Sequence, residues 1–391
     1  MPGLRASARR LTAVLAAAAV LMTLPVPAGA TATPACEVRD RTTPAGVLSD
    51  LAGAIAGATT GDTLEVRGTC AAADIAITTP LTIVGKRTNA LGAPTIAGSS
   101  AARLFRVAPG AATVTFRGLR LTGGNADTDP IASDIGGGFV IGSGTLVLAS
   151  VRMSGQVGGA PDGSWGGAIH LGPGTSVVLA GRTTIRGAFA KYGGAIWAEN
   201  GATVELRDRA SIANGPTTGI VAGGAVYLRP AASIVLRDDA SIHHVTASGG
   251  GGGAIDAQDA IVTLRDAASI HDATATGSWG GAISGLGDLP VITIRDDASL
   301  YRNHAVGGTA IASGGTITIA GRATIHDNDG TSADAPEIGK TGSAVEVWAY
   351  GAALTTITIQ GAARIRDNVA EIGRAHVSTP VTSRSRMPSS A

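Results

Sequence analysis

The sequence predicts an all-β fold, a single-stranded right-handed parallel β-helix with three strands per coil, and three observations carry this prediction. A Gly-Gly-Ala-Ile phrase recurs along the chain of 391 residues, and from Ile169 onward its spacings are 27, 30, 29, 28, 28 and 34 residues. Two other phrases, Leu-Arg-Asp and Ala-Ser-Ile, keep step with it. Each period holds three short runs in which apolar and polar residues alternate, as they do in half-buried strands.

Three strands and three turns within one period correspond to one coil of a solenoid. A leucine-rich repeat is the main alternative. It is not supported, because its Leu-rich, Asn-bearing consensus is absent and no helix-length segment fits between the strands. Equivalent strands of successive coils then pair with each other, and their side chains stack about 4.8 Å apart.

Residues 1–30 have the pattern of a secretory signal peptide. Three arginines precede an apolar run over residues 11–24, which is followed by the small-residue site Ala28-Gly29-Ala30. The run is too short for a stable membrane span, and no later segment has about eighteen unbroken apolar residues. We therefore expect an exported chain without a transmembrane span, either secreted or held at the cell surface.

Residues 31–60 form the expected N-terminal segment with a short capping helix. Leu48, Leu51 and Ile55 share one face of a helix. Such a helix would cover the first coil, whose open edge would otherwise pair with other chains.

Cys36 and Cys70 are the only cysteines. An exported chain can keep a disulfide, so we expect the two residues to be bonded to each other. Closing this loop contributes about 3 to 4 kcal/mol in the chain-entropy model.

The β-helix itself is expected over residues 61–370, in roughly 11 coils. Each coil buries about five or six Ile, Leu and Val side chains, which stabilise it by about 10 kcal/mol before chain entropy offsets most of that gain. A single coil is therefore unstable, and the stack stabilises itself. Before residue 160 the coils are less regular, with strand-like runs at 75–77, 81–84, 105–107, 114–116 and 146–148.

Residues 371–391 match the translation of a common short-read sequencing adapter, apart from one base at Ser378. We therefore expect this tail not to be native. Resequencing the gene tests this, because a tail encoded in genomic DNA would disprove it.

Two families share motifs with this sequence. The Gly-Gly-Ala-Ile phrases, followed by Ile-x-x-Asn-type motifs, resemble the repeats of polymorphic outer-membrane and autotransporter-like proteins; the motifs lie at 300–303, 325–328 and 365–368. The segments 61–64 and 81–85 resemble secreted bacterial right-handed parallel β-helix proteins of the pectate-lyase-like superfamily. The resemblance implies an exported β-helix that acts at the cell surface as an adhesin-like protein or on polysaccharides.

Four residues are the candidate ligand-binding site. If Ile169 and its equivalents point inward, the next residue in each of four consecutive coils points outward. Two aromatic rings between an imidazole and a carboxylate suit a sugar-binding strip. Scattered surface residues are the alternative. The four residues are His170, Trp197, Tyr227 and Asp256.

Two other columns of outward side chains, one of histidines and one of arginines, could have a chemical role. His243 and His271 fall on adjacent coils near Asp272. This cluster could bind a divalent metal, or the residues could simply belong to a polar outer face. Because a third ligand is missing, we expect no metal and no cofactor. The arginines of the Leu-Arg-Asp phrases form a second column, and the Asp after each one offsets its charge. This column is expected to be structural, with a strip for acidic polysaccharide as the alternative.

These observations favour a non-enzymatic, secreted or cell-surface protein with a structural, adhesive or glycan-binding role. The alternative is a polysaccharide lyase or glycoside hydrolase of the pectate-lyase-like superfamily, although the motif sets of those enzymes are not matched. The expected partner is an extracellular polysaccharide or a host or cell-surface glycan. A formal net charge of +1 gives no reason to expect nucleic acid. We expect a monomer.

Overall fold

The computed structural model describes residues 36–43, 46–99, 101–126, 135–159, 163–213, 220–287, 289–330, 343–347 and 355–370. The chain divides into two compact units, residues 1–33 and 34–391, and every described residue belongs to the second. The predicted signal peptide and the predicted adapter tail lie outside these ranges and stay predictions. In the ranges given, no helix is long and apolar enough to cross a membrane.

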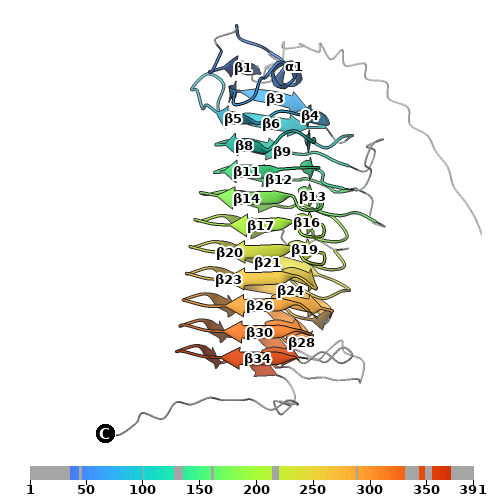
Figure 1. Cartoon of the computed structure of the whole chain (residues 1–391), viewed down its shortest axis with the longest axis vertical. Coiled ribbons are helices and arrows are strands. Elements are labelled where there is room, and N and C mark those ends of the chain that lie inside the picture. The colour runs from blue at the N-terminus through green and yellow to red at the C-terminus, as the bar shows by residue number, and fades with distance from the viewer. Residues whose placement is uncertain are drawn as a thin grey trace, which may run out of the picture. The chain divides into compact units, whose positions relative to one another are not determined.

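The second unit is a parallel β-solenoid whose turns stack one on another (Figure 1). Its strands form three sheets, which we name A, B and C. Sheet A contains β1 (Glu37–Asp40), β2 (Thr63–Arg67), β5 (Leu81–Gly85), β8 (Thr113–Arg117), β11 (Thr145–Ala149), β14 (Ser176–Ala180), β17 (Thr203–Leu206), β20 (Ser233–Leu236), β23 (Ile261–Leu264), β26 (Val291–Ile294), β30 (Thr316–Ile319) and β34 (Thr356–Ile359).

Sheets B and C complete each turn. Sheet B contains β3 (Thr69–Ala72), β6 (Thr95–Gly98), β9 (Arg120–Thr122), β12 (Arg152–Ser154), β15 (Thr184–Arg186), β18 (Ser211–Ala213), β21 (Ser241–Ala247), β24 (Ser269–Trp279), β27 (Ser299–Tyr301), β28 (His304–Gly307), β31 (Thr324–His326), β32 (Asp329–Gly330), β35 (Arg364–Arg366) and β36 (Val369–Ala370). Sheet C contains β4 (Ile75–Ile77), β7 (Phe105–Val107), β10 (Phe139–Ile141), β13 (Ile169–Leu171), β16 (Ile196–Ala198), β19 (Val226–Leu228), β22 (Ile255–Gln258), β25 (Ile283–Leu286), β29 (Ile311–Ser313) and β33 (Val345–Val347).

Each strand pairs in parallel with its equivalent in the neighbouring turns, so equivalent residues of the repeat lie side by side. In sheet C, for example, Ile169 pairs with Ile196 and Val226 with Ile255. The exception is β1, which pairs antiparallel with β2 at the N-terminal end. The predicted parallel β-helix with three strands per coil is confirmed. Right-handed winding, the usual sense for parallel crossovers, stays a prediction.

About eight turns, rather than the roughly 11 predicted, form the solenoid proper. Among the described strands, eight turns have all three strands paired with both neighbouring turns. The first of these turns consists of β7, β8 and β9, and the last contains β29, β30 and β31. The turns at the two ends are edges: β4 pairs only with β7 and β33 only with β29 in sheet C. The predicted number was too high because it counted these end segments as complete coils.

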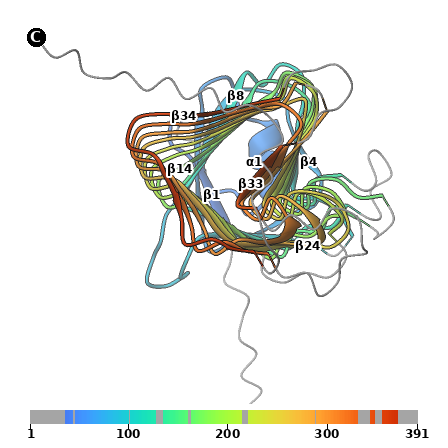
Figure 2. The same ribbon diagram turned by 90° about the horizontal axis from the view of Figure 1, so that it is seen from below.

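The three sheets surround the interior of the solenoid (Figure 2). Buried hydrophobic side chains form the core there. The repeated apolar positions point into it, and Ile169, Leu206 and Ile242 are fully buried. Near the N-terminal end, the Phe105, Phe116 and Phe139 rings fill the core, with ring centroids 4.9 to 5.3 Å apart. The alternating runs of the sequence therefore bury one side of each strand in a single column of core side chains.

The paired glycines of the Gly-Gly-Ala-Ile phrase have a structural role. Gly252 has a φ of +69°, a conformation that glycine adopts without strain. A Cβ on Gly253 would lie 2.1 Å from the carbonyl oxygen of Gly281 in the next turn. The phrase therefore marks a tight bend where the backbones of stacked turns approach closely.

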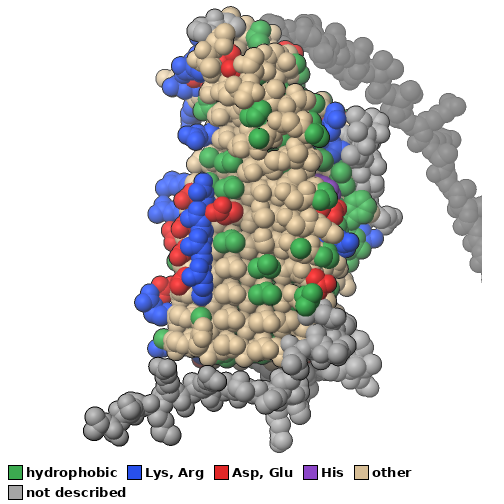
Figure 3. All heavy atoms as spheres, viewed as in Figure 1, with side chains coloured by type: hydrophobic (Ala, Val, Ile, Leu, Met, Phe, Trp, Pro, Cys, Tyr) green, Lys and Arg blue, Asp and Glu red, His purple; other side chains and the backbone are tan. Residues whose placement is uncertain are grey.

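The Leu-Arg-Asp phrases form the turn between sheets A and B. Asp208, Asp238, Asp266 and Asp296 have φ values of 57° to 60°. Each carboxylate accepts a hydrogen bond from a backbone N–H of the turn before it, at 2.7 to 3.4 Å. Arg237, Arg265 and Arg295 each pair with the next aspartate, at 2.9 to 3.2 Å. Figure 3 shows such a column of basic side chains with acidic ones beside it. The Arg–Asp pairs and the hydrogen bonds of the aspartates support a structural role for this arginine column.

The N-terminal segment contains the predicted helix and disulfide. Helix α1 (Leu51–Ala56) contacts β1, β3 and β4, and the Asp50 carboxylate caps it by accepting from two backbone N–H groups. Cys36 and Cys70 are bonded, as predicted. Leu48 is a correction: it lies outside α1, its backbone pairs with Val38, and it is 45% exposed. The Asp50 cap starts the helix only after this residue.

Candidate functional site

The four side chains of the predicted glycan-binding site lie side by side in sheet C. The register joins His170 to Trp197, Trp197 to Tyr227, and Tyr227 to Asp256. The Trp197 and Tyr227 rings stack with their centroids 4.5 Å apart. The alignment that the sequence predicts is therefore present in the structure.

The exposure of these side chains differs from what we expected. His170, Trp197, Tyr227 and Asp256 are 9%, 8%, 6% and 1% exposed. They point away from the main core, as predicted, but other parts of the chain cover them. The four residues are therefore not an exposed strip on which a glycan could lie.

The cover comes from residues that directly precede the Gly-Gly pairs. Trp197, Tyr227 and Ala222 form a second apolar cluster, and Trp165 and Tyr192 pack against it. The ring centroids of Trp165 and Trp197 are 6.0 Å apart, and those of Tyr192 and Tyr227 are 5.8 Å apart. The outer side of sheet C is thus a small second core. Strand alternation alone does not reveal it, because alternation says only which side of the sheet a residue occupies.

Polar groups in this second core are held in different ways. The Glu199 carboxylate lies 3.7 Å from His170 and accepts a hydrogen bond from the Trp197 indole at 2.8 Å. The interaction with His170 is the main cause that lowers the pKa of Glu199. Asp256 Oδ1 has no hydrogen-bond partner within the described residues, and burial raises the pKa of its carboxyl group well above the usual value.

The histidine column that suggested a metal is a stack of rings. His243 and His271 lie parallel with centroids 5.1 Å apart, and His271 Nδ1 is 2.6 Å from Asp272 Oδ2. Arg302 binds both oxygens of Asp272, at 2.8 and 2.7 Å, and lowers the pKa of that carboxyl to about 2. In the part of the chain that the structure describes, no group of three or more His, Cys, Asp or Glu could hold a metal ion.

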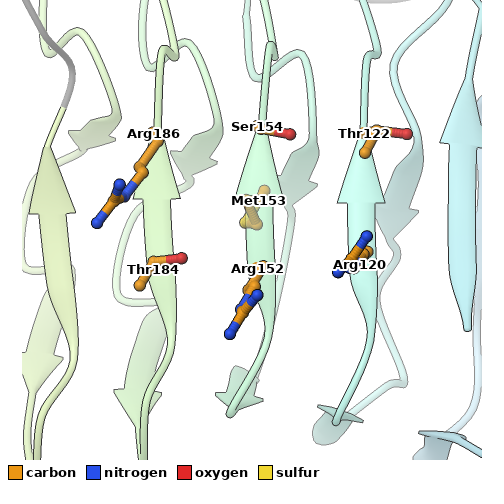
Figure 4. Close-up of a pocket in the computed structure, with 7 residues that line it drawn as sticks. All are labelled: Arg120, Thr122, Arg152, Met153, Ser154, Thr184 and Arg186. Carbon is orange, nitrogen blue, oxygen red and sulfur yellow. The ribbon is translucent and has the colours of Figure 1, made fainter. Parts of the chain in front are cut away.

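The best candidate site is a groove on the outer face of sheet B that we did not predict from the sequence. It has a volume of about 510 Å³, within the range of small-molecule sites. Three neighbouring strands, β9, β12 and β15, supply its lining (Figure 4). The lining residues are Arg120, Thr122, Arg152, Met153, Ser154, Thr184 and Arg186.

The geometry of the groove follows from strand pairing. Arg120 and Arg152 are direct partners on adjacent strands, so their Cα atoms are about 4.8 Å apart. Arg186 lies on the third strand, in the column of Ser154. A second hollow, which Arg87 also lines, shares Arg120 and Arg152 with the groove. The basic surface therefore extends beyond the groove toward the turn between sheets A and B.

The groove arginines are exposed, and none forms an ion pair with a carboxylate of the described residues. This contrasts with Arg237, Arg265 and Arg295 of the Leu-Arg-Asp phrases, which have aspartate partners. The sequence carries a signal for the difference: residues 75–198 contain ten Lys and Arg but only four Asp and Glu. A net charge summed over the whole chain hides this, because acidic residues dominate later in the sequence.

The groove can bind anions. Each guanidinium offers a planar set of donors that fits a carboxylate, sulfate or phosphate group, and hydroxyl side chains supply further hydrogen bonds. Comparison of the chain with protein-family models, with curated proteins and with solved structures finds no match.

Proposed function

We propose that the protein is a secreted or cell-surface, non-enzymatic β-helix protein that binds an acidic glycan on the outer face of sheet B. This keeps the adhesive or glycan-binding role that the sequence suggests and moves the contact surface from sheet C to sheet B. The relationship to the pectate-lyase-like superfamily belongs to the same proposal, supported by the parallel three-sheet solenoid and by the motifs in residues 61–85.

One observation carries the proposal: Arg120, Arg152 and Arg186 lie exposed in one groove without carboxylate partners among the described residues. Like charges at strand spacing repel one another, so the arrangement costs free energy until an anion arrives. A glycan with acidic groups supplies that anion, and its hydroxyl groups match Thr122 and Ser154. Because the groove is open, bound sugars would remain partly hydrated.

Binding without cleavage fits the lining of the groove. Glycoside hydrolysis generally needs two carboxyl groups on either side of the scissile bond. The residues that line the groove supply guanidinium and hydroxyl groups instead, because the Met153 side chain is buried in the main core. These groups can hold a sugar acid but do not form the acid and base pair of a hydrolase.

The test is glycan binding by paired arginine variants. Arg120→Gln with Arg152→Gln should weaken binding of an acidic polysaccharide about tenfold or more, since each lost charged contact is worth about 1 kcal/mol or more. Calorimetry at fixed ionic strength gives the dissociation constants. Arg295→Gln with Arg322→Gln is the matched control, because it removes the same charge outside the groove and should change affinity little.

Two results would overturn the proposal. Equal weakening by both variant pairs would mean that net charge, and not the groove, sets the affinity. Release of unsaturated products or new reducing ends from a polysaccharide panel would support the alternative function, a polysaccharide lyase or glycoside hydrolase.

A further inference from the structure

The outer face of sheet B carries a second ordered surface beyond the arginine groove. One column of this face runs through strand partners from Thr122 to Ser154 and Arg186, then on to Ala213. After Ala213 the same column consists of four rings, which we call the ring row: His243, His271, Tyr301 and His326.

The rings of the ring row stack face to face. The successive centroid distances are 5.1, 4.7 and 5.3 Å, and the planes lie within 10° of parallel. Because neighbouring rings cover each other's faces, a ligand beside the row meets mainly the ring edges. The side chains of His271 and His326 stay 16% and 20% exposed. The ring row thus presents polar edges at the spacing of the strands.

A row of hydroxyl groups runs beside the ring row. It occupies the column that begins with Arg120 and Arg152, and every member is partly exposed. The strand register aligns Thr184, Ser211, Ser241, Ser269, Ser299 and Thr324. Hydroxyl groups and ring edges together can form hydrogen bonds with the hydroxyl groups of a sugar chain.

The charge along this part of the face is low. The carboxylates of Asp272 and Asp327 lie 2.6 and 2.7 Å from the Nδ1 atoms of His271 and His326. Burial, with His271 and His244 nearby, lowers the pKa of His243 to about 4, so this ring is uncharged at neutral pH. The face therefore changes along its length from strongly basic to nearly neutral and polar.

We infer that the ring row and its neighbouring hydroxyl row form a second contact region for the same glycan, which lies along the solenoid axis across the strands of sheet B. The inference rests on the proposed function of the arginine groove. The ligand is a linear acidic polysaccharide whose acidic groups bind the groove and whose hydroxyl groups follow the ring row. The groove spans about 10 Å along the axis, and the groove with the ring row spans about 34 Å.

The test uses the full chain and two series of size-fractionated oligosaccharides. Heparin fragments carry sulfate groups as well as carboxylates, and alginate fragments carry only carboxylates. Fragments longer than about 34 Å should bind at least tenfold more tightly than fragments of about 10 Å. Tighter binding of the longer fragments, which we call the length gain, supports the inference in either series. A length gain with heparin alone points to sulfate as the acidic group, and one with alginate shows that carboxylates suffice. If the wild-type protein binds long and short fragments equally tightly in both series, the inference is overturned.

Substitutions separate the two contact regions. His271→Phe with Tyr301→Phe keeps stacked rings but removes the polar edges, so it should abolish the length gain and leave the affinity for short fragments unchanged. Thr263→Ala, on sheet A, is the control and should change neither. A thermal melt checks that the variants stay folded, and His326→Phe provides a second variant if the pair does not.

The two proposals fail in different ways. A length gain that survives the Phe pair overturns the ring row as a contact region while leaving the groove intact. If Arg120→Gln with Arg152→Gln leaves the binding of short fragments unchanged, the proposed function itself fails.

Discussion

Asp256 is a buried carboxyl group whose location carries a cost in stability. It is 1% exposed, its Oδ1 atom has no hydrogen-bond partner in the described part of the chain, and burial raises its pKa. In the unfolded chain the group ionises near its usual pKa of about 4. Above that pH the folded state must either keep the proton or bury the charge, and both lower the free energy of unfolding.

Asp256→Asn should therefore stabilise the protein at neutral pH. We expect the free energy of unfolding to rise by about 1 kcal/mol or more at pH 7, because an amide is less costly to bury than a carboxylate. The gain should shrink as the pH falls below about 4, where the unfolded chain is also protonated. Denaturant titrations at pH 7 and pH 3.5 measure the two values; a variant less stable than wild type at pH 7 would contradict this account.

At the scale of the strand and turn, the asparagine ladder shows how one polar residue joins neighbouring turns. Asn303 and Asn328 are fully buried where sheet B bends. Asn328 Oδ1 accepts from the backbone N–H and the side-chain amide of Asn303, and its own amide donates to the Leu300 carbonyl. Asn303 in turn accepts from the backbone N–H of Ala273. The ladder satisfies buried backbone groups that the tight bend would otherwise leave unpaired.

Asn328→Ala should lower the free energy of unfolding by about 1 to 3 kcal/mol, because it leaves a buried N–H of Asn303 without an acceptor. Thr318→Ala is the matched control, since Thr318 lies in the same turn on the outer side of sheet A and is partly exposed. Urea unfolding followed by circular dichroism compares the two variants. Equal losses would mean that the ladder contributes nothing specific.

The elements that could be predicted are those fixed by the repeat. Parallel stacking places equal phrases next to each other, so the alignment of Trp197 with Tyr227 follows from their positions in the Gly-Gly phrases. The covering of sheet C could not be predicted, because the segments before these phrases vary in length and alternation does not fix their course. The arginine groove was missed because β9 and β12 precede residue 160, where the coils are less regular, and β15 lacks the Ala-Ser-Ile phrase of later sheet B strands.

Over the whole molecule, the solenoid separates its charges along the sequence. Residues 75–198 are rich in arginine and lysine, whereas later turns compensate most arginines with aspartates. The early turns therefore attract anions, and the later turns, with paired charges and stacked rings, are more nearly neutral. A single repeat sequence thus builds one framework with two different surfaces, and this difference is the basis of the proposed glycan contacts.

The same one-dimensional organisation predicts how the molecule responds to loss of its disulfide. Each turn contacts mainly its neighbours, so a change at one end should weaken the nearby turns and leave distant ones intact. The Cys36–Cys70 bond closes a sequence separation of 34 residues, and the chain-entropy model gives about 4 kcal/mol for such a loop. Cys36→Ser with Cys70→Ser should therefore speed hydrogen exchange in α1 and β1–β4 while leaving exchange in β19–β27 unchanged. Faster exchange throughout the solenoid would show instead that the turns unfold as one cooperative unit.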